Sequence, residues 1–225
     1  MRKISKILAL LAAGALLGSM TACQNNSGET TAAPETETSA EETVTAETET
    51  TGEVGQTQPA GTAKALVVYF SWSGNTRNVA EEIAAQTGAD IFELIPAAPY
   101  SEDYNTVLDE AKQEQTEDAR PEISGTIDGF DGYDQVFLGF PNWWGDMPMI
   151  VYSFLDNYDL SGKTILPFCT SGGSRFSDSL NTIGSMEPEA EVLDGLSLGS
   201  FEAGSPENAV SEWLDSIGYS EKGEN

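Results

Sequence analysis

Five short apolar runs recur along the chain from Lys64 onward, and segments with a helical period lie between them. The runs cover residues 65–70, 91–95, 135–140, 163–169 and 191–198. The first run, ALVVYF, is continuous rather than alternating, which is typical of a strand buried on both faces. The fifth run gives the weakest signal, because Asp194 and Gly195 interrupt it.

The intervening segments predict helices. Apolar or small residues at Val79, Ile83 and Ala84 have helical spacing, so we expect a helix over residues 75–87 that ends at Gly88. Further helices are expected within 100–117 and over 148–157, 175–186 and 205–217, whereas residues 118–134 are expected to be irregular. Alternating strands and helices indicate an α/β domain whose parallel sheet is covered on both faces.

The first 22 residues have the layout of a secretory signal peptide. Three basic residues precede an apolar run over 7–17, and small residues follow. The run is too short to cross a bilayer core of about 30 Å. The segment Met20-Thr21-Ala22-Cys23 resembles the bacterial lipobox, with Met20 where Leu is usual. This resemblance implies lipidation of Cys23 and an extracytoplasmic domain anchored to the cell membrane; a plain secretory signal is the alternative.

A polar segment separates this leader from the domain. Residues 24–63 contain eight Glu, no Lys or Arg, and almost no bulky apolar residue. Such a composition buries too little surface to offset the entropy of ordering. We therefore expect a disordered tether over 23–63, a folded domain over 64–220 and a short tail over 221–225.

The charge of the chain restricts its partners. The formal net charge is −27, which repels nucleic acid and anionic lipid headgroups. No nucleic-acid partner is expected, and contact with the membrane is expected through the lipid only. The acidic surface is compatible with docking to a basic protein, and equally with solubility alone.

The residue inventory removes several kinds of catalytic site. The chain has no His, which excludes Ser-His-Asp and Cys-His nucleophilic sites. Two Cys without His do not make a conventional zinc site, and we expect no metal. With Cys23 lipidated, Cys169 has no disulfide partner, and its place at the end of a buried strand predicts a core residue rather than a reactive thiol.

Ligands of open parallel sheets bind beyond the carboxyl ends of the strands, so the loops there are the candidate sites. The segment 71–76 (SWSGNT) follows the first strand and leads into a helix. Its hydroxyls, Gly74 and the free N–H groups of a helix start form an anion cradle. It lacks the Lys of a Walker loop. The alternative is an ordinary turn in which Ser73 or Asn75 caps the helix.

Two more loops follow the third and fourth strands. The segment 141–145 (PNWWG) contains two adjacent Trp, which are suited to cover a flat ring system. The alternative is that both Trp pack on the neighbouring helix. The segment 170–173 (TSGG) allows close backbone approach to a ligand, with a flexible turn as the alternative.

These loops together resemble flavodoxins. The phosphate-loop pattern Thr/Ser-x-Thr/Ser-Gly-x-Thr falls on Ser71, Ser73, Gly74 and Thr76. The PNWWG and TSGG loops are similar to the flavin-contacting loops of a flavodoxin subfamily related to FMN-dependent NAD(P)H–quinone oxidoreductases. The resemblance covers residues 64 to about 218. The FMN-binding residues that it implies are Ser71, Trp72, Ser73, Gly74, Asn75, Thr76, Pro141, Asn142, Trp143, Trp144, Gly145, Thr170, Ser171, Gly172 and Gly173.

The resemblance also implies a fold and a function. The expected fold is a flavodoxin-like three-layer sandwich with a five-stranded parallel sheet in the order 2-1-3-4-5. The expected function is FMN-dependent electron transfer with a redox partner protein or a small electron acceptor, and Arg175 would favour negative charge on the reduced flavin. Two alternatives stay open: an FMN-dependent oxidoreductase acting on a quinone-like substrate, and a non-catalytic surface module that binds a ligand.

Overall fold

The computed structural model describes residues 63–219. The expected signal peptide, the lipidation site at Cys23, all of the tether except residue 63, and the tail lie outside these residues. Within them, no helix combines the length and apolar character that crossing a bilayer requires.

A parallel sheet forms the centre of the domain, as the sequence predicted. Its strands have the order β2-β1-β3-β4-β5, and a sixth strand, β6, also pairs with β4. The bounds are β1 (Ala65–Tyr69), β2 (Asp90–Glu93), β3 (Gln135–Pro141), β4 (Thr164–Ser171), β5 (Glu191–Val192) and β6 (Leu196–Gly199). All five residues of β1 are buried, which agrees with its unbroken apolar run. The flavodoxin-like order 2-1-3-4-5 is therefore confirmed.

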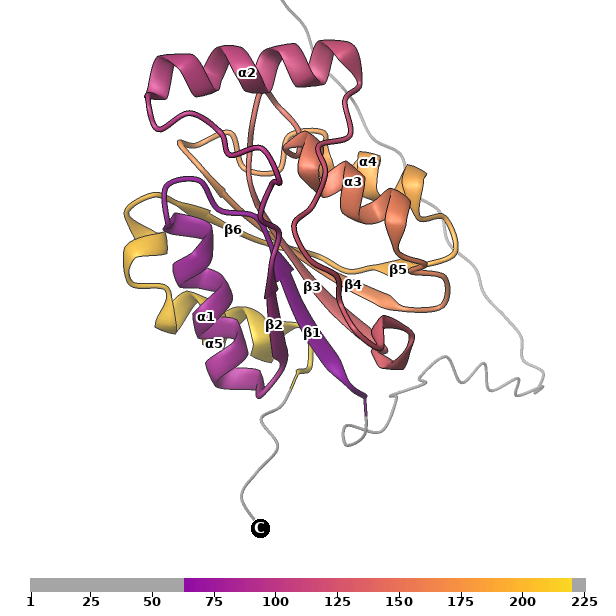
Figure 1. The fold of residues 1–225 in the computed structure, drawn as a ribbon. Coiled ribbons are helices and arrows are strands. Elements are labelled where there is room, and N and C mark those ends of the chain that lie inside the picture. The colour runs from indigo at the N-terminus through magenta and orange to yellow at the C-terminus, as the bar shows by residue number, and fades with distance from the viewer. Residues whose placement is uncertain (1–62, 220–225) are drawn as a thin grey trace, which may run out of the picture. The chain divides into compact units, whose positions relative to one another are not determined.

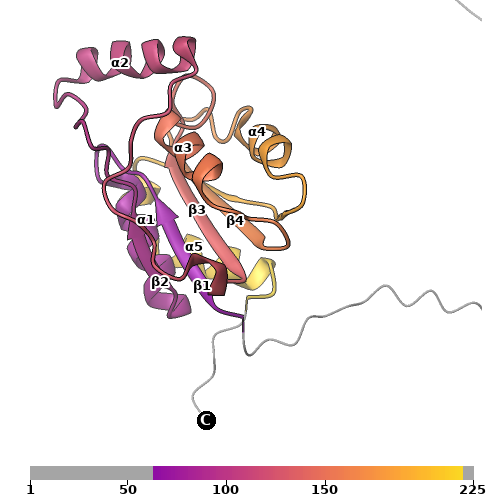
Figure 2. The same cartoon turned by 45° about the vertical axis from the view of Figure 1, so that its right-hand side comes forward.

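Helices cover both faces of the sheet (Figure 1). Alternate side chains of β1 point to opposite sides, so Val67 belongs to one core cluster and Leu66 and Val68 to the other. The first cluster packs against α1 (Asn75–Thr87) and α5 (Glu207–Ser216), and the second packs against α3 (Met149–Asn157) and α4 (Ser179–Met186). Figure 2 shows the two helical layers from a second direction.

The expected fifth strand is split by a bulge. Two residues of β4 (166–167) face three residues (193–195) between the pairs Ile165–Val192 and Phe168–Leu196. Pro167 has no N–H to donate toward this strand. Gly195 lies so close to it that an added Cβ would sit 2.6 Å from the Pro167 carbonyl oxygen.

Helix α4 begins later than the sequence predicted. The pattern placed its start at residue 175, but the structure places it at Ser179. Arg175 and Ser177 have φ angles of 55° and 47°, which is left-handed backbone and incompatible with a right-handed helix. The residues before α4 therefore remain a loop at the end of the sheet. The segment 118–134 is irregular as expected, apart from one short 3₁₀ turn, η1 (Phe130–Gly132).

Helix α2 (Tyr104–Glu117) lies apart from the two helical layers. It runs beyond the carboxyl ends of the strands rather than along the sheet (Figures 1 and 2). Asp103 caps its first turn, and its side chain accepts a hydrogen bond from the Thr106 N–H. Of its fourteen residues only Val107 and Ala111 are buried. A cleft lies between this helix and the loops at the strand ends.

Candidate functional site

A cleft of about 370 Å³ lies between α2 and the carboxyl ends of β1, β3 and β4. Its volume falls within the usual range of small-molecule sites, roughly 300–1,000 Å³. The three loops selected from the sequence all contribute to its walls. The lining residues are Trp72, Ser73, Asn75, Tyr104, Val107, Leu108, Ala111, Pro141, Asn142, Trp143, Trp144, Thr170, Ser171, Gly172 and Ser200.

The loop after β1 presents backbone N–H groups that have no protein partner. Among residues 63–219, no acceptor bonds the N–H groups of Ser73, Asn75 or Thr76, whereas the Gly74 N–H donates to Ser71 Oγ at 3.1 Å. Gly74 is the N-cap of α1 with φ 92°, and no side chain caps the helix. The alternative of Ser73 or Asn75 as cap is therefore wrong. Unpartnered N–H groups at a helix start suit an anion.

Thr76 and Ser71 support this loop from within. Thr76 is 1% exposed, and its Oγ1 lies 2.9 Å from Thr170 Oγ1. Ser71 Oγ accepts the bond from Gly74 and so shapes the turn. Neither side chain lines the cleft, and neither does Gly74. Their hydroxyls hold the cradle in place, while its backbone N–H groups and the cleft-lining Ser73 and Asn75 are left for a ligand.

The two Trp of the β3 loop have different surroundings. The ring of Trp143 packs edge-on against Phe70 and Tyr100, with centroids 5.3 and 5.2 Å away. Trp144 is 50% exposed, and its Nε1–H donates to the carbonyl oxygen of Leu108 in α2 at 3.0 Å. Both rings line the cleft. Trp143 therefore packs against aromatic residues of two loops, whereas Trp144 contacts helix α2 and keeps half of its surface exposed.

Asn142 joins this loop to the loop after β4. Its Nδ2 donates to the Arg175 carbonyl at 2.8 Å and to Ser177 Oγ at 3.2 Å, and its Oδ1 accepts from the Gly145 N–H at 3.1 Å. The side-chain amide is thus used within the protein. Although Asn142 lines the cleft, this arrangement makes its amide a support for the two loops. Gly145 is absent from the lining.

The loop after β4 is organised by Ser171. The Ser171 Oγ accepts hydrogen bonds from the N–H groups of Gly173 and Arg175, at 3.2 and 2.9 Å. Gly173 has φ 124°, a conformation that favours glycine. Thr170, Ser171 and Gly172 line the cleft, whereas Gly173 and Arg175 do not. The Arg175 side chain is exposed, so the structure does not place its charge at the cleft wall.

Sequence reasoning missed the wall that α2 forms. Tyr104, Val107, Leu108 and Ala111 line the cleft, and so does Ser200 after β6. The four α2 positions have the i, i+3, i+4, i+7 spacing of an apolar helical face. That spacing was visible in the sequence, but it predicts only that a face is covered, and not by what.

Two titratable groups near the cleft are perturbed by burial. Burial raises the pKa of Tyr100, and so does the hydrogen bond that its hydroxyl donates to Glu114 Oε2 at 2.7 Å. Burial also raises the pKa of the Cys169 thiol to about 12. Cys169 is 1% exposed, so the prediction of a core residue is confirmed.

Comparison with known proteins identifies the family. A family profile described as Flavodoxin matches residues 64–217. The chain belongs to the flavodoxin family. The matched region contains the three loops and α2, so the cleft lies wholly within the flavodoxin domain. A search of curated proteins found no significant match.

Solved structures of flavoproteins resemble the domain. A candidate flavoprotein from Bacteroides eggerthii is 34% identical, with a TM-score of 0.62; the match covers 70% of this chain and 99% of that one. A second, from Bacteroides uniformis, is 29% identical with a TM-score of 0.62, over 68% and 98% of the two chains. A flavoprotein from Lactobacillus acidophilus, crystallised in complex with FMN, is 24% identical with a TM-score of 0.54, over 68% and 99%.

Proposed function

We propose that this flavodoxin binds FMN in the cleft between α2 and the strand ends and uses it for electron transfer. The observation that carries the proposal is the run of unpartnered N–H groups at Ser73, Asn75 and Thr76, which opens beside an aromatic-walled cleft. Membership of the flavodoxin family and the FMN complex of a structural relative support it.

The residues present fit the two parts of FMN. The N–H groups at the start of α1 suit a terminal phosphate, because a helix start favours negative charge without a side-chain cation. Arg77, which follows the cradle directly in the sequence, is paired with Glu93. Trp72, Trp143 and Trp144 offer apolar surface to a flat ring system. When bound, FMN supplies the redox chemistry, and this chain supplies its binding, orientation and shielding from water.

The proposal is tested by FMN retention. Purified residues 24–225 are incubated with FMN, desalted, and their visible absorbance recorded. We expect one FMN per chain, and loss of binding in Gly74→Asp, which places a carboxylate in the anion cradle. Riboflavin, which lacks the phosphate, is expected to bind more weakly than FMN. A folded protein that retains no flavin would refute the proposal and favour the non-catalytic ligand-binding module.

A role as electron carrier is favoured over direct reduction of a substrate. The apolar face of α2 already covers one side of the cleft, which leaves less room for a second flat molecule beside the flavin. We therefore expect reduction by a small one-electron donor to be fast and reduction by NADH to be slow. Rapid NADH oxidation coupled to quinone reduction would instead establish the oxidoreductase alternative.

We also propose that the chain is exported and lipidated at Cys23. The motif Met20-Thr21-Ala22-Cys23 supports this. Residue 63 leads into β1 at its amino end, and the cleft lies at the carboxyl ends of the strands. A tether that ends there would thus leave the cleft accessible. The test is fractionation of cells expressing the full chain: membrane association lost in Cys23→Ala supports the proposal, and a cytosolic wild-type chain refutes it.

A further inference from the structure

Helix α2 directs its apolar face at the cleft. Tyr104, Val107, Leu108 and Ala111 form one stripe of the helix, and all four line the cleft. Tyr104 remains 62% exposed and Leu108 only half-buried. Val107 and Ala111 are already buried by the protein, whereas a flat ligand in the cleft would cover the exposed parts of Tyr104 and Leu108.

Hydrogen bonds from neighbouring loops hold α2 in this position. The Trp144 Nε1–H donates to the Leu108 carbonyl, in the middle of the helix, at 3.0 Å. The Tyr100 hydroxyl donates to Glu114 Oε2 at 2.7 Å. At the other end, the Trp72 Nε1–H donates to the Ser101 carbonyl, just before the helix, at 2.9 Å. The helix is thus held by a few individual bonds and by the burial of only two of its residues, Val107 and Ala111.

Trp144 has an unusual backbone conformation. Trp144 has φ 53°, left-handed backbone that costs a bulky residue conformational free energy. The Trp143 and Asp146 backbones hold it in a tight turn through reciprocal hydrogen bonds of 2.8 and 3.1 Å. This turn places the Trp144 indole over the cleft with its nitrogen against α2.

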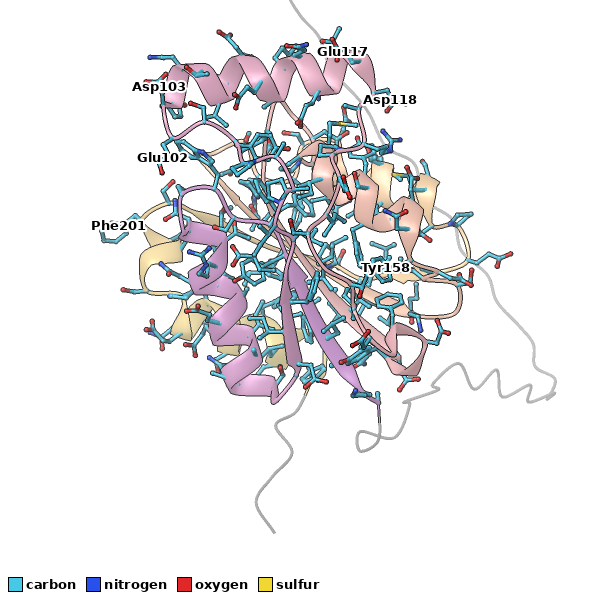
Figure 3. All side chains as sticks on the ribbon, viewed as in Figure 1. Glu102, Asp103, Glu117, Asp118, Tyr158 and Phe201 are labelled. Atoms are coloured by element: carbon cyan, nitrogen blue, oxygen red, sulfur yellow. The ribbon has the colours of Figure 1, made fainter. Side chains whose placement is uncertain are left out.

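The charges of α2 weaken it as an isolated helix. Asp103 lies at its start, where negative charge is favourable, but Glu117 and Asp118 lie at its end (Figure 3), where the helix dipole makes negative charge unfavourable. The last turn contains no basic residue. A helix with little burial and an unfavourable end opens locally at low free-energy cost.

We propose that α2 is a movable wall of the FMN site, the fourth beside its three loops. Trp144 acts as a latch, because its hydrogen bond to Leu108 holds α2 in place. This inference rests on the proposed function. The stripe 104–111 accepts one flat aromatic ring system against the opposing Trp side chains. Breaking the Trp144–Leu108 bond lets α2 move away and so speeds the entry and exit of the flavin. Trp144 therefore sets the rates of flavin exchange more than the affinity.

The rates of FMN binding distinguish a latch from a direct contact. In Trp144→Phe a smaller aromatic ring replaces the indole, and the bond to Leu108 is lost. The Trp144–Leu108 bond holds α2 whether the cleft is empty or filled. Its loss should therefore make association and dissociation both faster, by about fivefold, and should change the Kd little. The measurement is stopped-flow fluorescence of FMN with residues 24–225. A rise in the dissociation rate alone would show that Trp144 acts only through its contact with the flavin and not through the bond to Leu108, and would overturn the inference.

The matched control is Trp213→Phe. The Trp213 Nε1–H donates to the Asp194 carbonyl at 3.0 Å, a bond of the same type, but Trp213 belongs to the core cluster on the α1 and α5 face, away from the cleft. This variant should leave both rates unchanged.

Hydrogen exchange of the FMN-free protein separates this inference from the proposed function. In Trp144→Phe, the amides of α2 should exchange about fivefold faster, while those of α1 keep their wild-type rates. Failure of the wild-type chain to bind FMN would refute the proposed function, and exchange would still test the latch. Binding of FMN with unchanged rates and unchanged α2 exchange would overturn the inference alone.

Discussion

The hydroxyls of Thr76 and Thr170 lie 2.9 Å apart in the interior, 94 residues apart in sequence. Thr76 stands in the first turn of α1, and Thr170 stands near the end of β4, where it lines the cleft. This single contact ties the anion cradle to the loop after β4. The cradle and the loop after β4 are thus held together by this buried pair even when no ligand is bound.

Removing one member of this pair should destabilise the protein. Thr76→Val leaves the buried Thr170 hydroxyl without its partner, at a cost of about 1–3 kcal/mol in the free energy of unfolding. The double variant Thr76→Val/Thr170→Val should be more stable than the sum of the two single changes predicts. Urea unfolding of the four proteins checks this. Strictly additive changes would show that the two hydroxyls do not interact.

Gly74 should matter for binding, and Gly88 for stability alone. Both have positive φ, 92° and 68°, and an added Cβ meets no atom within 4 Å at either position. Alanine therefore introduces backbone strain of about 1–2 kcal/mol at each end of α1. We expect Gly74→Ala to weaken FMN binding about tenfold and Gly88→Ala to leave the Kd unchanged, measured by fluorescence titration. Equal effects on the Kd would contradict a cradle at Gly74.

Salt should strengthen FMN binding. The phosphate is anionic, the chain carries a net charge of −27, and no cationic side chain lines the cleft. Screening reduces the repulsion between them, because the Debye length falls from about 30 Å at 0.01 M to about 10 Å at 0.1 M. The Kd for FMN should fall over this range, while that for neutral riboflavin stays constant. A Kd for FMN that rises with salt would indicate a cationic site.

Cys169 should be inert in the native protein. Burial raises the pKa of its thiol to about 12, so at pH 8 the reactive thiolate is scarcer by about three orders of magnitude than in an unperturbed thiol of pKa about 8.5. Iodoacetamide labelling of residues 24–225, followed by mass spectrometry, should be very slow without urea and complete with it. Rapid labelling of the folded protein would show that the Cys169 thiol, near the end of β4, is accessible to the reagent.

Much of this fold was predictable because the local sequence pattern of an element agrees with the way that element packs in the domain. The unbroken run at 65–69 specifies a doubly buried strand, and the helix over 75–87 has both its spacing and its Gly88 terminator in the sequence. The start of α4 was not predictable, because the left-handed backbone at Arg175 and Ser177 is accompanied by bonds to Asn142, more than thirty residues earlier in the sequence.

The three loops that line the cleft were predictable from the sequence, but the wall formed by α2 was not. The topology of a parallel sheet brings the segments 71–76, 141–145 and 170–173 to one edge, so their sequence was enough to select them. The stripe on α2 has the same pattern as any core-facing helix. Only the three-dimensional placement of α2 shows that the stripe faces a cleft.

The most direct test of the account is an NMR titration of ¹⁵N-labelled residues 24–225 with FMN. Amide protons that donate to a phosphate shift strongly, so the account predicts the largest changes at Ser73, Asn75 and Thr76, with ring-induced changes at Trp144 and in α2. Riboflavin should reproduce the changes at Trp144 and α2 but not those at the start of α1. Largest changes at residues outside the cleft, such as those of α5, would contradict FMN binding at this site.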